Sequence, residues 1–158
     1  MIIDYTFFDL REERYSALYR AWLVTHLLSA NRNGKLQLSI YKAQQIDYIL
    51  KTPQLFKRAC QFLSGAQSAV NVSEALYSFE INKSQTFDKQ DFLGKLMQLC
   101  SGGVVEIVKE DGVFFVKCLM VPPASELSAQ IHLESQIVAI KGLAQKTELV
   151  VNKIILGE

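Results

Sequence analysis

Apolar residues recur at regular spacings along this chain, and the first long run has the spacing of a helix. From Arg11 to Asn31 they return every three or four residues, which predicts a long, mostly buried helix. The segment Asn31–Gly34 ends this helix, because Asn and Gly tolerate left-handed backbone conformations. The side chains expected on its buried side are Tyr15, Leu18, Trp22 and His26, with Tyr19, Leu23 and Leu27 beside them.

A short strand and two more helices are predicted next. Lys35–Leu38 alternates polar and apolar residues, as a strand does, and the hydroxyl of Ser39 can cap the helix that follows. Thr52 and Pro53 start another helix, because proline fits a first turn, where its missing N–H would have had no partner. Gly65 ends that helix. The apolar faces of the two helices are Tyr41, Ile46, Ile49 and Leu50, and then Leu55, Phe56, Ala59, Cys60 and Leu63.

The segment from Ala66 to Phe87 fits neither the helical nor the strand period over its whole length, so the sequence predicts no structure for it. Asp88 is then expected to cap a helix that ends at Gly102 and Gly103. The apolar side chains of this helix are Phe92, Leu93, Leu96, Met97 and Cys100.

The clearest local pattern is a β-hairpin. Val104–Val108 and Val113–Val121 are predicted strands, and Lys109–Gly112 between them contains the Asp-Gly pair that tight hairpin turns favour. Pro122 and Pro123 stop the second strand, because proline cannot donate to a strand ladder.

Two further helices are predicted, from about Ser125 to Ala144, where Gly142 weakens the end, and from Glu148 to Leu156. No repeat, low-complexity segment or linker divides the chain, so residues 1–158 are expected to form one domain with one core. A short strand, helices and then a hairpin follow one another as in a winged helix, where the strand pairs with the hairpin. We therefore expect an α+β, mainly helical, winged-helix-like domain with a long N-terminal helix, a β-hairpin wing and C-terminal helices.

Composition and charge narrow the classes of function. The chain has 158 residues, 49% of them hydrophobic, and a chain of this length can bury roughly 70% of its unfolded surface without disulfides or metals. Its 17 Lys plus Arg and 16 Asp plus Glu give a net charge of +1, which disfavours a free-standing DNA-binding protein. The charge balance still permits a local basic patch that contacts DNA, although a solvated helix face explains the same residues equally well. The candidate DNA contacts are Arg32, Lys35, Lys51, Lys57 and Arg58.

The cysteines and histidines are scattered. Cys60, Cys100 and Cys118 are odd in number, far apart and inside apolar stretches, so they are predicted to be reduced core thiols. His26 is expected in the core and His132 at the surface or an interface. The first residues lack the features of a secretory signal, and no apolar run approaches the roughly 20 residues that span a bilayer. A cytoplasmic protein without a membrane segment is therefore expected.

No pattern of reactive residues points to an active site. Ser101–Gly103 follows a helix and precedes a strand, the reverse of the order in phosphate-binding loops. The isolated cysteines and histidines predict no zinc site. Glu106, Glu110 and Asp111 fit solvated turn chemistry better than a metal site. We therefore expect no enzymatic activity, catalytic residue, metal or cofactor. The sequence does not exclude a catalytic group formed by residues that are distant in the chain and meet only in the folded protein.

Two apolar features indicate contact with a partner protein. Phe114 and Phe115 point to opposite faces of a strand, so one should face outward if the other packs on the core. The final helix is unusually apolar, so it should dock on this domain or on another subunit. The candidate interface residues are Phe114, Phe115, Leu149, Ile154, Ile155 and Leu156. Polar substitutions at Ile154 and Leu156 are expected to release the partner and leave the fold intact.

Within residues 1–60, a block of the sequence comprises Phe8–Arg11, Tyr15, Leu18–Leu23, Leu27–Leu28 and Gly34–Leu38. This block resembles the small middle component of bacterial ABC three-component systems, including the small subunit of Lamassu-type anti-phage defence complexes. The later helix and hairpin agree with that family in outline. The matching residues support a fold, and the resemblance supplies no catalytic motif to carry over.

The resemblance implies a non-catalytic, winged-helix-like accessory subunit in anti-phage or anti-plasmid defence. Such a subunit would bind an SMC-like coiled-coil ATPase, bridge its heads and restrain an effector nuclease, and it would meet DNA only through the complex. Two rival hypotheses remain. A winged-helix DNA-binding transcriptional regulator predicts a basic face and a symmetric dimer, whereas a metal-dependent enzyme predicts convergent carboxylates.

Overall fold

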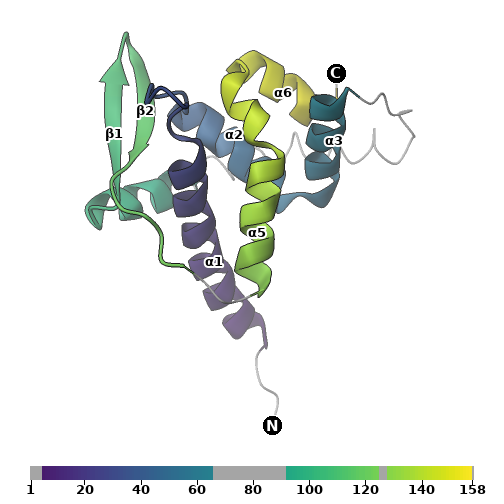
Figure 1. Cartoon of the computed structure of the whole chain (residues 1–158). Coiled ribbons are helices and arrows are strands. Elements are labelled where there is room, and N and C mark those ends of the chain that lie inside the picture. The colour runs from purple at the N-terminus through teal and green to yellow at the C-terminus, as the bar shows by residue number, and fades with distance from the viewer. Residues whose placement is uncertain (1–4, 66–91, 125–127, 158) are drawn as a thin grey trace.

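The computed structural model describes the backbone of residues 5–65, 92–124 and 128–157, and the side chains from Tyr15 onward within these ranges. The elements are α1 (Tyr5–Leu28), α2 (Ile40–Lys51), α3 (Pro53–Ser64), a helix over residues 92–101, β1 (Val105–Glu110), β2 (Val113–Cys118), α5 (Ser128–Ala139), the 3₁₀ helix η1 (Lys141–Gln145) and α6 (Glu148–Leu156). Helices thus dominate, and β1 and β2 form an antiparallel pair (Figure 1). The expected α+β, mainly helical class is confirmed.

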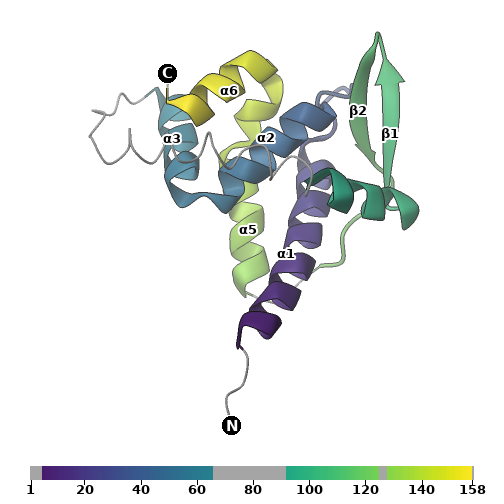
Figure 2. The same cartoon turned by 180° about the vertical axis from the view of Figure 1, so that it is seen from behind.

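Helix α1 lies near the middle of the structure. The hairpin and the helix over residues 92–101 lie on one side of it, α3 and α6 lie on the other, and α2 runs from its contact with β2 across to α3 (Figures 1 and 2). Helix α5 runs beside α1 and contacts it. The two sides of α1 therefore have different neighbours.

The buried face of α1 differs in part from the predicted one. It is made mainly of small and branched residues at helical spacing, Ala17, Ala21, Val24 and Leu28, together with the predicted Leu23. Tyr15, expected to be buried, is 69% exposed, and Trp22 and His26 are half-buried. The small alanine side chains let neighbouring elements approach closely, which a search for large apolar residues overlooks. The helix also begins at Tyr5, well before the predicted start at Arg11.

The predicted boundaries of α2 and α3 are confirmed. The hydroxyl oxygen of Ser39 accepts a hydrogen bond of 3.1 Å from the backbone N–H of Lys42, which caps α2. Pro53 lies in the first turn of α3, directly after Thr52. Gly65 ends α3 in the left-handed conformation, with φ of 76°. Local capping chemistry therefore determines where these two helices begin and end.

The predicted hairpin is also confirmed, with a shorter second strand. Asp111 and Gly112 form its two-residue turn with φ values of 51° and 79°, as a type I′ turn requires. Strand β2 ends at Cys118 and not at Val121. Beyond it, the N–H groups of Leu119 and Met120 both donate to the Val104 carbonyl, at 2.9 and 3.3 Å, so the regular ladder stops before the prolines.

The predicted strand Lys35–Leu38 meets the hairpin at one point. The N–H of Val116 donates to the Leu38 carbonyl at 3.0 Å, and Ser39 pairs with Phe115 as an isolated bridge. This antiparallel contact brings the segment before α2 onto the free edge of β2. The segment itself forms isolated bridges and no regular strand.

The helix predicted to end at Ala144 is divided into α5 and η1. Gly142 lies in η1, where an added Cβ would come within 3.0 Å of the Leu63 side chain. Glycine thus permits close packing of η1 on α3, besides weakening the helix. Helix α6 spans the predicted residues. Ala66–Phe87, the expected cap Asp88 and the start of the predicted helix at Ser125 lie outside the described residues.

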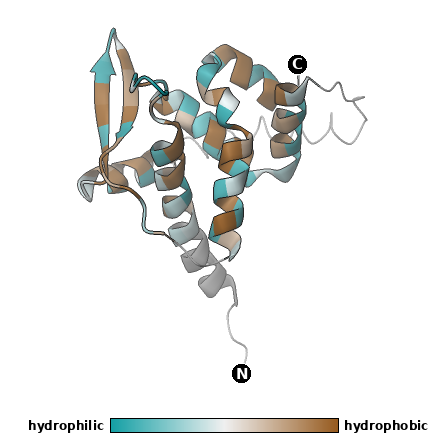
Figure 3. Cartoon of the chain, in the orientation of Figure 1, coloured by the Kyte–Doolittle hydropathy of each residue, from teal (hydrophilic) through white to brown (hydrophobic). Residues whose placement is uncertain are grey.

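One continuous apolar cluster joins the elements described, and Figure 3 shows apolar residues on the helices and the hairpin alike. Its largest fully buried members are Leu28, Leu38, Ile46, Ile49, Leu55, Leu96, Ile137, Ile140, Leu143 and Ile155. These residues come from almost every helix, so the helices stabilise one another chiefly by burying this shared cluster. Among the helices described, none is long and apolar enough to cross a membrane.

Candidate functional site

A surface groove of about 240 Å³ lies between α1, α5 and the segment that connects β2 to α5. We call this segment, Leu119–Ala124, the strap. The groove is lined by Tyr19, Leu23 and His26 of α1, by Val121, Pro122, Pro123 and Ala124 of the strap, and by Gln130, Ile131 and Glu134 of α5. It combines an apolar lining with a few polar groups, as binding clefts commonly do.

The strap is tied to α1 although it has no regular secondary structure. The indole N–H of Trp22 donates to the Met120 carbonyl at 2.8 Å. The same carbonyl accepts a hydrogen bond from the Cys118 thiol at 3.0 Å. These contacts, with the two bonds to the Val104 carbonyl, fix the backbone at the start of the strap.

The strap nevertheless presents apolar side chains to solvent. Met120 is 54% exposed and Val121 is 71% exposed, and Leu119 beside them is also exposed. Ile131, on the opposite wall of the groove, is 56% exposed. Contiguous exposed apolar side chains of this kind are typical of protein-binding surfaces, whereas single exposed apolar residues are common everywhere.

His26 and Cys118, which are 92 positions apart in the sequence, come together beside the groove. The Cys118 sulfur lies 4.0 Å from Nδ1 of His26. Burial raises the pKa of the Cys118 thiol, and its hydrogen bonds to Met120 and Trp22 oppose the rise only in part. A thiol of raised pKa stays protonated at neutral pH and is a poor nucleophile. The pair therefore fits a structural contact better than a nucleophile and its base.

A second polar cluster joins the beginnings of α2 and α6. The Ser39 hydroxyl donates to the Glu148 carboxylate, and the Gln45 amide donates to the Glu148 carbonyl at 3.2 Å. The Lys42 ammonium donates to the backbone carbonyls of Gln37 and Ala144, at 3.1 and 3.0 Å. Ser39 and Gln45 are buried, so a substrate has no access to them. This cluster holds α6 on α2 and is not a candidate active site.

Burial lowers the pKa of Lys42, and the nearby Glu148 carboxylate partly offsets this change. Burial also raises the pKa of Cys60 and Cys100, which are half-buried as free thiols. The three cysteines are thus reduced and partly covered, close to the prediction of core thiols.

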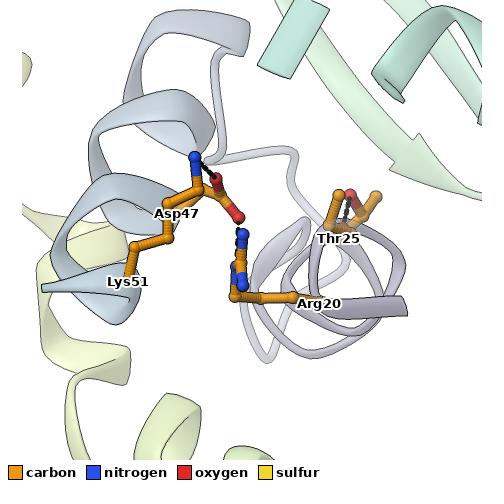
Figure 4. A network of polar contacts seen from close by, with 5 residues as sticks. Arg20, Thr25, Asp47 and Lys51 are labelled. Atoms are coloured by element: carbon orange, nitrogen blue, oxygen red, sulfur yellow. Dashed lines mark hydrogen bonds and ion pairs between the residues drawn. The ribbon is translucent and has the colours of Figure 1, made fainter. Parts of the chain in front are cut away.

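A buried ion pair connects α1 to α2 (Figure 4). Nε of Arg20 lies 2.7 Å from an Asp47 carboxylate oxygen, and the Lys51 ammonium lies 3.9 Å from the other oxygen. Thr25 donates to the Ala21 carbonyl within α1, at 2.9 Å. The Asp47 side chain is almost fully buried and neutralised by its neighbours, so it has a structural role.

The predicted interface residues of α6 are mostly buried in this chain. Ile154 is 4% exposed and Ile155 is fully buried, Leu156 is half-buried, and Leu149 is largely exposed. Arg58 of α3 donates to the carbonyls of Ile154 and Ile155, at 3.0 and 3.2 Å, which holds the end of α6 in place. The expectation that Ile154 can be made polar without disturbing the fold is therefore wrong, because α6 docks on its own domain.

The two aromatic residues of the hairpin lie on opposite faces, as predicted. Phe114 shares the inward face with Val116, which is fully buried, but it lies near the turn and is 51% exposed. The Lys109 ammonium lies 5.5 Å from its ring centre. Phe115, on the outward face, is half-buried beside the bridge to Ser39. Of the pair, Phe114 is the more accessible to a partner.

The candidate DNA contacts are not brought together into one basic face. Arg32 and Lys35 are exposed before the start of α2, whereas Lys51 is its last residue, and Lys57 and Arg58 follow in α3. A helix of 12 residues separates these ends by about 18 Å. Lys51 is near Asp47 and Arg58 donates to α6, which leaves Lys57 as the exposed member of the second set.

The part of the chain described by the structure holds no group of three or more His, Cys, Asp or Glu side chains that could bind a metal ion. No pattern in the sequence predicts the groove. The available signal is the apolar run Leu119–Val121 directly before two prolines, which has the pattern of a strand end. No protein-family model, no curated protein and no solved structure matches this chain.

Proposed function

We propose that this chain is a non-catalytic accessory subunit of an SMC-like ATPase complex in anti-phage or anti-plasmid defence. In this role it binds the coiled-coil ATPase in the cytoplasm, bridges the ATPase heads and restrains an effector nuclease. The resemblance of residues 1–60 suggests the kind of complex, and the observation that carries the binding role is the exposed apolar strap beside the groove.

The strap supports a protein-binding role because its side chains are exposed while its backbone is held. Hydrogen bonds from Trp22, Leu119 and Met120 fix its position. A fixed apolar surface loses little conformational freedom when a partner covers it, so more of the burial contributes to affinity. Burying a side chain such as Met or Val contributes roughly 1.5–3 kcal/mol at most.

The topology around the hairpin supports the winged-helix-like part of the proposal. The segment before α2 contacts β2 through the bridge between Ser39 and Phe115, and a helix directly precedes β1. In DNA-binding proteins of the helix-turn-helix type, the recognition helix presents polar and basic residues to the major groove of DNA. Here the helix over residues 92–101 exposes Leu93 and Met97, which are one turn apart and apolar. This favours a protein partner over the alternative, a DNA-binding transcriptional regulator.

The test is affinity purification of the tagged chain from its native cells, with the bound proteins identified by mass spectrometry. A coiled-coil ATPase and a nuclease should be recovered with the unaltered chain. A variant carrying Met120→Ser and Val121→Ser should recover at least about tenfold less ATPase, the loss expected when about 1.4 kcal/mol of binding is removed.

The matched control is Val138→Ser, which removes an exposed apolar side chain of α5 that does not line the groove. This variant should recover the ATPase as well as the unaltered chain does. Recovery of the chain without any ATPase would contradict the proposed complex, and equal recovery by the strap variant would show that the partner binds elsewhere.

A further inference from the structure

The groove carries a negative charge without a partner in the described structure. Glu134 lines one wall from α5, and its side chain is exposed and takes part in none of the ion pairs found among the described residues. Gln130, one helical turn earlier, lines the same wall, and the Tyr19 side chain lines the α1 side. All three groups can accept hydrogen bonds, and neither of the ion pairs among the described residues involves Glu134.

Apart from His26 of α1, the rest of the lining is apolar, and the space is small. Leu23, Val121 and Ile131 give the groove an aliphatic surface next to the carboxylate. Its volume of about 240 Å³ is below the range of roughly 300–1,000 Å³ that is typical of sites for cofactors and drug-sized ligands. One long side chain, with an aliphatic stem and a charged end, fits both the size and the chemistry.

We propose that the groove receives an arginine side chain from the partner protein. The methylene groups of the arginine pack on Val121 and Ile131, and its guanidinium reaches the Glu134 carboxylate, with the Tyr19 ring available for stacking. Arginine suits this site better than lysine because its planar guanidinium binds a carboxylate through two parallel hydrogen bonds and stacks on aromatic rings. The assignment rests on the proposed function, since it names the chemistry of the partner at the strap.

The proposal is tested on the whole chain with the peptide acetyl-Leu-Arg-Leu-amide. The control peptide carries citrulline, the uncharged isostere of arginine, at the same position. Trp22 is the only tryptophan of the chain and its indole N–H bonds to the strap, so its NMR signal reports on occupation of the groove. The arginine peptide should shift this signal in a saturable way and bind about three- to fivefold more tightly than the citrulline peptide, as expected for an exposed ion pair.

The decisive variant is Glu134→Gln, which keeps the size of an exposed side chain and removes its charge. It should bind both peptides equally, with the affinity that the unaltered chain has for the citrulline peptide. Glu110→Gln, a neutralised carboxylate at the hairpin turn, should keep the full preference for arginine. The preference should also weaken as salt is raised.

An arginine preference that survives Glu134→Gln, or a lysine peptide that binds more tightly than the arginine peptide, would overturn the assignment. So would the absence of any saturable shift of the Trp22 signal. These results are separate from the purification test. If the ATPase still depends on Met120 and Val121, the accessory role stands while the arginine contact fails.

Discussion

The two sides of α1 differ in how far their apolar side chains are buried. On the side of α3 and α6, Val151, Ile154 and Ile155 of α6 are buried, and the carbonyls at the end of α6 receive hydrogen bonds from Arg58. On the side of the strap, Met120 and Val121 remain exposed although hydrogen bonds hold the backbone beneath them. Folding of this chain alone accounts for the first arrangement.

The second arrangement has a different explanation. Exposed apolar side chains on a held backbone contribute little to the stability of the free chain, because burial and not position supplies the hydrophobic free energy. A binding partner that covers the strap would recover that free energy. The comparison therefore separates a part of the molecule that maintains the fold from a part that is available for recognition, and each part predicts different responses to substitution.

The largest effect is expected at the ion pair that joins α1 to α2. Asp47→Ala should lower the free energy of unfolding by about 3–5 kcal/mol, because it leaves the largely buried Arg20 guanidinium without its carboxylate. Urea denaturation measures this change. Lys51→Ala should cost less than about 1 kcal/mol, since Lys51 is farther from the carboxylate and more exposed. Equal losses in the two variants would contradict the dominant role of Arg20.

A double substitution tests whether the uncompensated charge causes the loss of stability in Asp47→Ala. Replacing Arg20 by Met and Asp47 by Leu removes both charges at once and should restore most of the stability that Asp47→Ala loses, because no uncompensated charge then stays buried. If the double variant is as unstable as Asp47→Ala, packing around Asp47 and not charge balance limits stability.

The next largest effect contrasts one residue from each side. Ile155→Ala should destabilise the chain by about 2–5 kcal/mol, because it opens a cavity at a fully buried position. Met120→Ala should change stability by no more than about 0.5 kcal/mol, since its side chain is more than half exposed. Thermal denaturation of both variants measures the difference. A large loss at Met120 would show that the strap stabilises the fold and would weaken its assignment as a binding surface.

Local chemistry in the sequence was sufficient to predict the hairpin turn at Asp111 and Gly112 and the helix ends at Ser39 and Gly65. Each depends on a few adjacent residues whose backbone preferences are strong. The sequence could not predict the groove, because its geometry depends on contacts such as the bond from Trp22 to the Met120 carbonyl, across 98 positions. No local pattern specifies which helix a connecting segment will lie against. For the same reason the sequence leaves open whether the final helix docks on this domain, as it does, or on another subunit.

A smaller effect is expected from the cap of α6. The Thr147 hydroxyl oxygen accepts a hydrogen bond of 3.3 Å from the Val150 N–H. Thr147→Ala should therefore lower the free energy of unfolding by about 1 kcal/mol, whereas Thr147→Ser, which keeps the hydroxyl, should lose much less. Chemical denaturation of the pair measures the cap alone. Equal stability of the alanine and serine variants would show that packing, and not capping, fixes the start of α6.

The smallest effect is a pH dependence at Lys42. Its pKa is lowered in the folded chain from the ordinary value of 10.5, chiefly by burial, so in the pH range just below that value the unfolded state binds more protons than the folded state. Stability from this group should therefore rise with pH in that range. The raised pKa values of the three thiols act in the opposite direction, because the unfolded chain loses those protons first.

Comparison with Lys42→Met isolates the lysine from the thiols. Removing Lys42 also removes its bonds to the carbonyls of Gln37 and Ala144, which should lower stability by a similar amount across this pH range. The deficit of the variant should then widen as the pH rises towards the ordinary lysine value of 10.5, because only the unaltered chain gains stability from this group. Urea midpoints at several pH values measure the difference. A deficit that narrows with rising pH would mean that Glu148, and not burial, dominates the environment of Lys42.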